Sequence, residues 1–496
     1  MNSTSEYYRE DGTHGVPIWR IGGFAMNNLA TNLYLFFMGY VAYYLSGWVG
    51  VSTVLAGSFS MIMRIWDGVT DPLVDLLVNK TDGKFGKNRP FMVIGQLILC
   101  ITSYILFHVT HILPEIVRFP FFIVVSCVYY LGYTAQSIVT KSGQICLTND
   151  PKQRLIFTIF DAVYNTLLFA MIQVIATNLS VKYGGFLKDV RLYQDLWVIT
   201  AVLSAICTVV AVISIAPKDK TEFYVTNKNS KVSIKDYLDT LSNNKALQML
   251  IVSASSDKLA FQIRGNVAVM AVLMGVVVGD YAVNGIISSM VAIPTTVFVV
   301  LLVGGLSTAL GQKKAMLIGS WGSIICQILL IILWVFGDPK TLSNGQGNVR
   351  MGYFFVFYLI LNVVNGGLSG VAGNMVIPMT ADCADYEVYR TGKYIPNLMG
   401  TLFSFVDKIV SSFAPMLVAW LYAAIGFTDA LPDQNAEYST ALFSVSLFCL
   451  YGAPIIGLIC NIVALKIYPL TKEKMEEIQE KIAEIKAKAN ARQLEQ

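Results

Sequence analysis

Polar residues recur at helical spacing inside one long apolar run of the sequence. Arg64, Asp67, Thr70, Asp71 and Asp75 recur at spacings of three and four, which places them on one face of a helix. They must face the protein interior, because ionisable groups in hydrocarbon are costly. Two carboxylates this close need a cation, a proton or a basic partner between them. The spacing of Asp67 and Asp71 therefore predicts a cation site at these two residues, with Thr70 as a further oxygen ligand.

An alternative is an internal salt-bridge ladder in which Arg64 only holds helices together. An all-oxygen shell would suit Na+, whereas H+ needs one carboxylate, so both ions stay open and no other metal or cofactor is expected. Asp75 lies near the end of the run, beside Lys87 and Arg89 of the next loop. We assign these three residues to a gate that a charge pair could lock.

Further ionisable residues lie within other apolar runs: Lys141, Asp161, Asp257, Lys258, Arg264, Asp407 and Lys408. Lys141, Arg264 and Lys408 could present a positive cavity to an anionic solute. Asp161 or Asp407 would then neutralise the cavity when it is empty. Internal ion pairs that bind no ligand would give the same pattern of charged residues in the sequence. Both interpretations, a solute-binding cavity and internal ion pairs, therefore remain.

The composition of the whole chain is that of a membrane protein. Hydrophobic residues make up 55% and charged residues 14% of its 496 residues, which is too apolar for a soluble protein. The basic residues collect between apolar runs, without the aromatic-lined stripe of a nucleic-acid surface. The eight cysteines contain no Cys-x-x-Cys pair, and neither HExxH nor GxSxG occurs, so we expect no disulfide framework, zinc site or enzyme.

Twelve apolar runs are long enough to cross roughly 30 Å of hydrocarbon. They lie at 21–46, 52–78, 90–112, 119–147, 155–181, 193–216, 246–276, 281–306, 314–336, 351–378, 394–425 and 441–468. The sequence therefore predicts an all-α membrane protein with twelve transmembrane helices in two six-helix halves. The expected parts are an N-terminus at 1–20, halves at 21–216 and 246–468, a linker at 217–245 and a tail at 469–496.

The loops on one side of the predicted membrane carry most of the basic residues. They hold Lys80, Lys84, Lys87, Arg89, Lys152, Arg154, Lys313, Lys314, Arg390 and Lys393, with further lysines in the linker and tail. The positive-inside rule then places both termini in the cytoplasm of a cell-membrane protein. Only the loop with Lys182, Lys188 and Arg191 argues the other way. In the tail, Met475, Ile478, Ile482 and Ile485 form one helical stripe, which predicts an amphipathic docking helix.

The segment 86–95, after the second run, is similar to 311–319, after the eighth. Corresponding loops in two parallel halves are typical of the major facilitator fold, in which the substrate lies between the halves near mid-membrane. We therefore expect that fold, in a monomer embedded in a lipid bilayer.

Several motifs in chain order resemble one transporter family, the glycoside-pentoside-hexuronide:cation symporters. They are Arg64-Ile-Trp-Asp67-Gly-Val-Thr70-Asp71-Pro72, the loop 79–90, Gly132-Tyr-Thr134-Ala, the segment 148–154, Ala381-Asp382-Cys-Ala-Asp385-Tyr386, Thr391-Gly392 and Lys408. The resemblance covers essentially the whole chain. It implies that Asp67, Thr70, Asp71 and Thr134 bind the coupling Na+, Li+ or H+, although Thr70 replaces the family's amide.

The resemblance is weaker at the sugar site. The family's acidic residues on helices one and four correspond to Asn27 or Asn28 and to Ser137, and a tryptophan corresponds to Lys141. The substrate-binding candidates are Asn27, Asn28, Ser137, Lys141, Asp161, Arg264 and Lys408. We expect symport of a small polar solute, such as a glycoside, pentoside or hexuronide. The alternatives are a carrier of a non-sugar anionic or amphipathic solute, which an apolar-walled cavity would favour, and a non-transporting sensor.

Overall fold

The computed structural model describes residues 15–220, 241–391 and 406–481, except 82, 149, 185–186 and 346. Within these residues the only β pairing is an isolated bridge between Ser343 and Val349. The first-half helices are α1 (Ile18–Met38), α2 (Val41–Tyr44), η2 (Leu45–Val49), α3 (Thr53–Lys80), α4 (Arg89–Tyr104), η3 (Ile105–Val109), η4 (Thr110–Ile112), α5 (Glu115–Leu147), α6 (Pro151–Lys182) and α7 (Val190–Ile215).

The second half follows the same plan. Its helices are α9 (Lys245–Arg264), α10 (Val267–Met270), η6 (Ala271–Val277), α11 (Ala282–Leu310), α12 (Gln312–Phe336), η7 (Pro339–Leu342), α13 (Tyr353–Thr391), α15 (Ala414–Ala424), α16 (Thr440–Leu447), η8 (Phe448–Gly452) and α17 (Ala453–Ile467). Residues 406–412 and 472–481 are also helical. Each predicted apolar run coincides with helix in the described chain, which confirms the all-α prediction; the run 394–425 is described only from 406.

Nine helices of the described chain are individually long and apolar enough to span a membrane, and α9 with α10 and η6 makes a tenth, bent by 46°. Helix α3 is absent from this group, because its ionisable residues lower its mean hydropathy. Its 28 residues are nevertheless long enough to cross a bilayer. The helix that carries the predicted cation site is therefore less apolar than most of the other long helices of the described chain.

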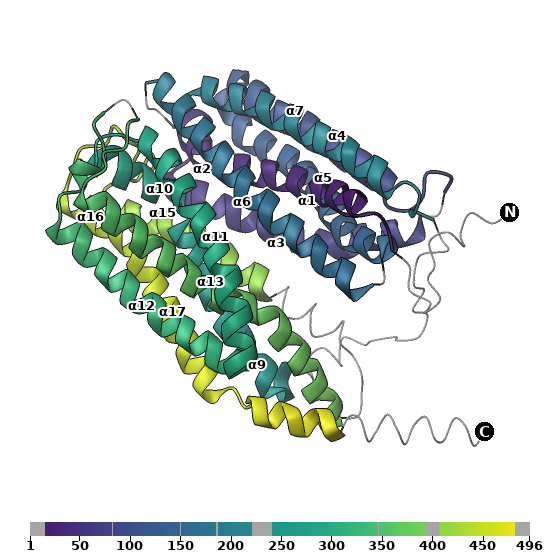
Figure 1. Cartoon of the computed structure of the whole chain (residues 1–496). Coiled ribbons are helices and arrows are strands. Elements are labelled where there is room, and N and C mark those ends of the chain that lie inside the picture. The colour runs from purple at the N-terminus through teal and green to yellow at the C-terminus, as the bar shows by residue number, and fades with distance from the viewer. Residues whose placement is uncertain are drawn as a thin grey trace, which may run out of the picture.

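The two halves form two bundles that meet along a limited surface (Figure 1). In the first bundle α1 packs on α5, α6 and α7, and α4 packs on α5 and α7. In the second, α13 packs on α11 and α12, and α17 packs on α9 and α12. Helices α6 and α11, and helices α3 and α15, join the bundles.

Both halves begin with a broken helix. Helix α1 ends at Met38 and continues after a short break as α2 and the π-helical turn η2; α9 ends at Arg264 and continues as α10 and η6. Interrupted helices at corresponding positions of two repeats are typical of transporters, and they lie beside the binding site.

The two bundles are in contact at one end, which we call the closed end. There the Tyr43 hydroxyl donates to the Pro432 carbonyl at 2.6 Å, and the Thr53 amide donates to the Thr428 carbonyl at 2.9 Å. Toward the opposite end, which carries the loop after α3, the loop after α7 and the helix 472–481, the bundles diverge (Figure 1). We call this the open end.

The described part of the tail is a docked helix, as its stripe predicts. Ile478 is fully buried and Met475 packs against the same apolar cluster, which includes Cys383 and Tyr468. Gln479 donates to the Asp385 carboxylate at 2.6 Å. The other two predicted stripe residues, Ile482 and Ile485, lie outside the described residues.

Candidate functional site

The predicted acidic pair lies on α3 and faces other helices. Asp67 is 1% exposed, and its Oδ1 accepts a hydrogen bond of 2.8 Å from the Thr134 hydroxyl of α5. The Thr70 hydroxyl donates to the Asp67 carbonyl at 3.0 Å and lies 3.4 Å from the Thr134 hydroxyl. The structure therefore brings the four residues Asp67, Thr70, Asp71 and Thr134 to one place.

Lys408, from the helix 406–412, supplies the basic partner of this acidic pair. Its Nζ lies 3.4 Å from Asp67 Oδ2 and is also paired with Asp71 Oδ2. The other Asp71 oxygen is buried and has no hydrogen-bond partner. Lys408, predicted to bind solute, thus occupies the space between the two carboxylates. Arg64, the partner in the alternative interpretation, forms no ion pair with any described residue.

The candidates on α1 make contacts within the first half. Asn27 is fully buried, and its Nδ2 donates to the Gln136 carbonyl at 3.1 Å and to the Thr140 hydroxyl at 2.8 Å. Asn28 donates to Asp161 at 2.6 Å. Asp161 forms no ion pair within the described chain. Its partner in this conformation is the Asn28 amide, and the neutralising role expected of Asp161 or Asp407 stays a prediction.

The two candidates on α5 are less constrained. Lys141 is exposed and makes no hydrogen bond to another described residue, although it lies within electrostatic range of Asp71. Ser137, one turn earlier on α5, is half-buried. Their assignment to the solute stays a prediction.

A cavity of about 790 Å³ lies within the second half. Helices α9, α10, η6, α11, α12, α13 and α17 and the helix 406–412 line it with Asp257, Lys258, Arg264, Asp407, Asn284, Asn362, Gln327 and many apolar side chains. Lys258 lies 4.0 Å from Asp407. Arg264 donates to Asn362 at 3.2 Å. The expected cavity with three basic residues is therefore not assembled here, because Lys408 is held by the acidic pair and neither it nor Lys141 lines this cavity.

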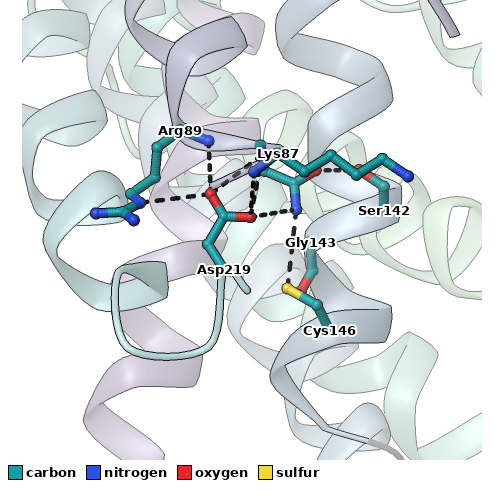
Figure 2. Close-up of polar contacts among 7 residues, drawn as sticks. Lys87, Arg89, Ser142, Gly143, Cys146 and Asp219 are labelled. Carbon is teal, nitrogen blue, oxygen red and sulfur yellow. Dashed lines mark hydrogen bonds and ion pairs between the residues drawn. The ribbon is translucent and has the colours of Figure 1, made fainter. Parts of the chain in front are cut away.

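The predicted gate contains a residue that sequence reasoning missed. Asp219, just after α7, is 1% exposed and accepts hydrogen bonds from the backbone amides of Lys87, Asn88 and Arg89 at 2.9–3.2 Å (Figure 2). It also pairs with the Arg89 side chain at 3.4 Å. Asp75 is exposed on α3, and its role in the gate stays a prediction.

Asp219 caps the N-terminus of α4. The first amides of a helix have no partner within it, and a carboxylate is favoured there by the helix dipole. Asn88, the cap residue of α4, makes no capping hydrogen bond through its side chain. The sequence carries no signal of this contact, because Asn88 is itself a residue type that favours helix caps and nothing identifies Asp219, which we placed in the linker.

Gly86 is required where this cap meets the loop after α3. Its φ is +81°, and a Cβ would lie 2.3 Å from both the carbonyl and Oδ2 of Asp219. We expect Gly86→Ala to destabilise the protein by about 1–3 kcal/mol, because both the backbone conformation and the space are unsuited to a side chain. Thermal unfolding in detergent measures this. The control is Gly83→Ala, whose Cβ meets nothing; equal effects would contradict the argument.

Known proteins resemble this chain over most of its length. Residues 23–472 match the family model for MFS/sugar transport proteins, where MFS is the major facilitator superfamily. The inner membrane symporter YicJ of Escherichia coli (strain K12) is 24% identical, over 93% of this chain and 94% of that protein. The isoprimeverose transporter of Lactiplantibacillus pentosus is 22% identical, over 90% and 88%. A glucuronide carrier protein homolog of E. coli (strain K12) is 24% identical, over 93% and 94%.

Solved structures support the fold. The crystal structure of the nucleoside transporter NupG superposes with a TM-score of 0.56 at 13% identity and covers 91% of this chain and all of that one. At this identity the likeness shows the major facilitator fold alone, and so confirms the predicted architecture. The chain belongs to the MFS/sugar transport family, and the predicted resemblance to its glycoside-pentoside-hexuronide:cation symporters is confirmed.

Proposed function

We propose that the protein is a secondary active symporter that couples movement of Na+ or H+ to uptake of a small polar, sugar-like solute across the cell membrane. The relatives named as a symporter, a sugar transporter and a glucuronide carrier homolog support this function. The observation that carries it is the ammonium of Lys408 between the carboxylates of Asp67 and Asp71.

This arrangement suits an exchange of cations. Two carboxylates in a low dielectric hold one positive charge at a time more favourably than none. Na+ entering beside Asp67 and Asp71, or protonation of one of them, would weaken their hold on Lys408. The freed lysine side chain could then contact solute or allow the helix 406–412 to move. By linkage, a cation that favours solute binding is itself bound more tightly when solute is present.

The proposed orientation of the protein in the membrane follows from the distribution of its basic residues. The open end carries the basic residues Lys84 and Lys87 of the loop after α3, and Lys313 and Lys314 of the first turn of α12. The positive-inside rule favours the cytoplasm for this end. The described conformation would then be inward-facing, and outward opening would break the contacts of Tyr43 and Thr53 at the closed end.

Uptake into proteoliposomes tests the proposal. A panel of neutral glycosides, uronides and sulfonated sugars is offered under an imposed Na+ or H+ gradient. We expect at least one solute to accumulate only when one of the two gradients is present. Uptake that ignores both gradients, or no uptake across the panel, would contradict coupled symport.

Thr134→Val should weaken the cation dependence without abolishing it. The substitution keeps the shape of the side chain but removes the hydroxyl that donates to Asp67 at 2.8 Å. A hydrogen bond to a charged group contributes about 1.5–3 kcal/mol, so the cation concentration for half-maximal uptake should rise about tenfold or more. An unchanged half-maximal concentration would remove Thr134 from the site. The control is Thr200→Val on α7, a threonine buried away from the acidic pair.

A second candidate function is favoured by the walls of the second-half cavity. Apolar residues such as Phe261, Met270, Met274, Ile287 and Val291 line much of it. Such walls suit an amphipathic anion better than a fully hydroxylated sugar. In the uptake assay this candidate predicts that solutes with an apolar group are preferred over sugars without one.

A further inference from the structure

A buried glutamine holds α5 against three other helices of the first half. The Gln136 side chain is fully buried, and both of its polar atoms have partners. Its Oε1 accepts a hydrogen bond of 3.1 Å from the Thr31 hydroxyl of α1. Its Nε2 donates to Gln96 Oε1 and the Met92 carbonyl of α4 at 3.2 and 3.4 Å, and to the Thr208 hydroxyl of α7 at 3.4 Å. One side chain therefore relates the position of α5 to α1, α4 and α7.

The partners of Gln136 are themselves held in place. Gln96 Nε2 donates to the Tyr34 hydroxyl at 3.2 Å and to the Ser204 hydroxyl at 2.8 Å. The Gln136 carbonyl accepts from Asn27 at 3.1 Å. Hydrogen bonds depend on direction as well as distance, whereas apolar contacts do not. Because a connected buried network makes an interface rigid, this network limits rotation of α5 about its own axis.

Helices α4 and α5 also approach each other closely beside Gln136. A Cβ on Gly95 would lie 2.9 Å from Gln136 Cγ and 3.0 Å from the Gly132 carbonyl, and a Cβ on Gly132 would lie 2.7 Å from Ile98 Cγ2. Both glycines thus permit a backbone approach that a side chain would prevent. Helix α5 has little space to move toward α4, and the hydrogen bonds of Gln136 oppose movement away from it.

Another face of α5 carries the residues of the candidate site. Thr134, Ser137 and Lys141 recur at spacings of three and four and so share a face. Gln136 lies on a different face, because successive residues of a helix are about 100° apart. The Thr134 hydroxyl donates to Asp67 Oδ1 at 2.8 Å. A hydroxyl lies about 4 Å from the axis of its helix, so a rotation of about 15° moves it by about 1 Å, which exceeds the tolerance of about 0.5 Å for a binding group.

We infer that Gln136 is a positioning residue for the cation site. It acts through α5 and not by contact with the ion: the network fixes the rotation of the helix, and that rotation places the Thr134 hydroxyl against Asp67. The inference rests on the proposed function, in which Asp67 and Asp71 bind the coupling ion. It also assigns Asn27, a solute candidate in the sequence, to the network that supports α5.

Gln136→Met tests this role in the full-length protein, in the proteoliposome uptake assay. The substitution keeps the length of the side chain but removes its hydrogen bonds. We expect the Na+ concentration for half-maximal uptake to rise about threefold to tenfold; if H+ is the coupling ion, the pH for half-maximal uptake should move by about half a unit to one unit. The control is Asn461→Leu, which removes a fully buried amide of α17 that bonds Ser253 and Ser320 in the second half. It should lower the unfolding temperature and leave the ion dependence unchanged.

A double-mutant cycle separates positioning from stability. In the Thr134→Val background, Gln136→Met should change the half-maximal ion concentration by less than about twofold, because no hydroxyl remains to be misplaced. A purely structural role of Gln136 would give the same fold-change in both backgrounds. Equal fold-changes, or a wild-type ion dependence in the Gln136→Met single variant, would overturn the inference.

Thr31→Val provides a second variant if Gln136→Met does not fold. It preserves the shape of the side chain and removes the donor to Gln136 Oε1, so the half-maximal ion concentration should change by about threefold. Thr31→Ser keeps the hydroxyl and should keep the wild-type value. A Thr31→Val protein that is less stable but has the wild-type ion dependence would show that the network is only structural.

The outcomes separate this inference from the proposed function. If no solute of the panel accumulates in response to either gradient in the wild type, symport is wrong and the inference falls with it. If the wild type couples uptake to one ion and Gln136→Met does so at the same half-maximal concentration, symport stands and only the role of Gln136 is removed.

Discussion

Asp67→Asn is expected to abolish cation-coupled uptake, with a fall of about a hundredfold or more in the stimulation by the coupling ion. The substitution removes one of the two negative charges that face Lys408, so Asp71 alone must attract both that lysine and an incoming cation. The asparagine oxygen can still accept the bond from Thr134, and Lys408 stays paired with Asp71. Folding should therefore survive, and insertion should improve because helix hydropathy rises.

The measurement compares uptake with and without the coupling ion in Asp67→Asn, Asp71→Asn and the wild type. Asp195→Asn is the control, since it makes the same change in α7, where Asp195 pairs with Lys182. It should keep the wild-type response. If both α3 variants respond to the ion as the wild type does, the cation site lies elsewhere.

Asp219→Ala is expected to lower the free energy of unfolding by about 3–5 kcal/mol, as loss of one member of a buried charged pair does. Three backbone amides and the Arg89 side chain would lose their acceptor at a place with little water (Figure 2). The first turn of α4 and the end of α7 would then separate. Solute uptake should fall with the amount of folded protein.

Thermal or denaturant unfolding of the purified protein measures the loss. The matched control is Asp189→Ala, because Asp189 caps α7 by accepting from the Arg191 amide but is more exposed and pairs with an exposed arginine. Loss of such a cap costs about 1 kcal/mol. Similar losses in the two variants would show that burial and the arginine pair add nothing at Asp219.

The sequence predicted the helices well, because hydropathy alone determines where a chain can cross a bilayer. It predicted α13 less well: the apolar run was expected to end at 378, but the helix continues to Thr391. Hydropathy identifies the part of a helix in lipid, whereas the backbone hydrogen bonds extend as long as no residue stops them. The last turns of α13 carry polar residues and support the docked tail.

At the site, the spacing of residues within α3 predicted which of them share a face of the helix. The contacts between different helices could not be predicted from the sequence. The intervals of α3 predicted that Asp67 and Asp71 share a face, and the family resemblance added Thr134. No interval predicts that Lys408, 341 residues from Asp67, lies between the acids, or that Asn28 contacts Asp161. Asp219 was missed for the same reason, since its partners precede it by about 130 residues. Long-range contacts depend on how the helices pack, which composition does not encode.

The polarity of α3 also bears on how the protein is made. A segment partitions from the translocon into lipid according to its own hydrophobicity, and Asp, Lys and Arg near its centre oppose that step. Helix α4 belongs to a segment that is apolar enough to span a membrane by itself, whereas its neighbour α3 carries Arg64, Asp67, Asp71 and Asp75. Its integration therefore depends on partners that shield those charges, such as α5, which supplies Thr134. We therefore expect the integration of α3 to depend on helices that are synthesised after it, which couples the order of biogenesis to the residues of the cation site.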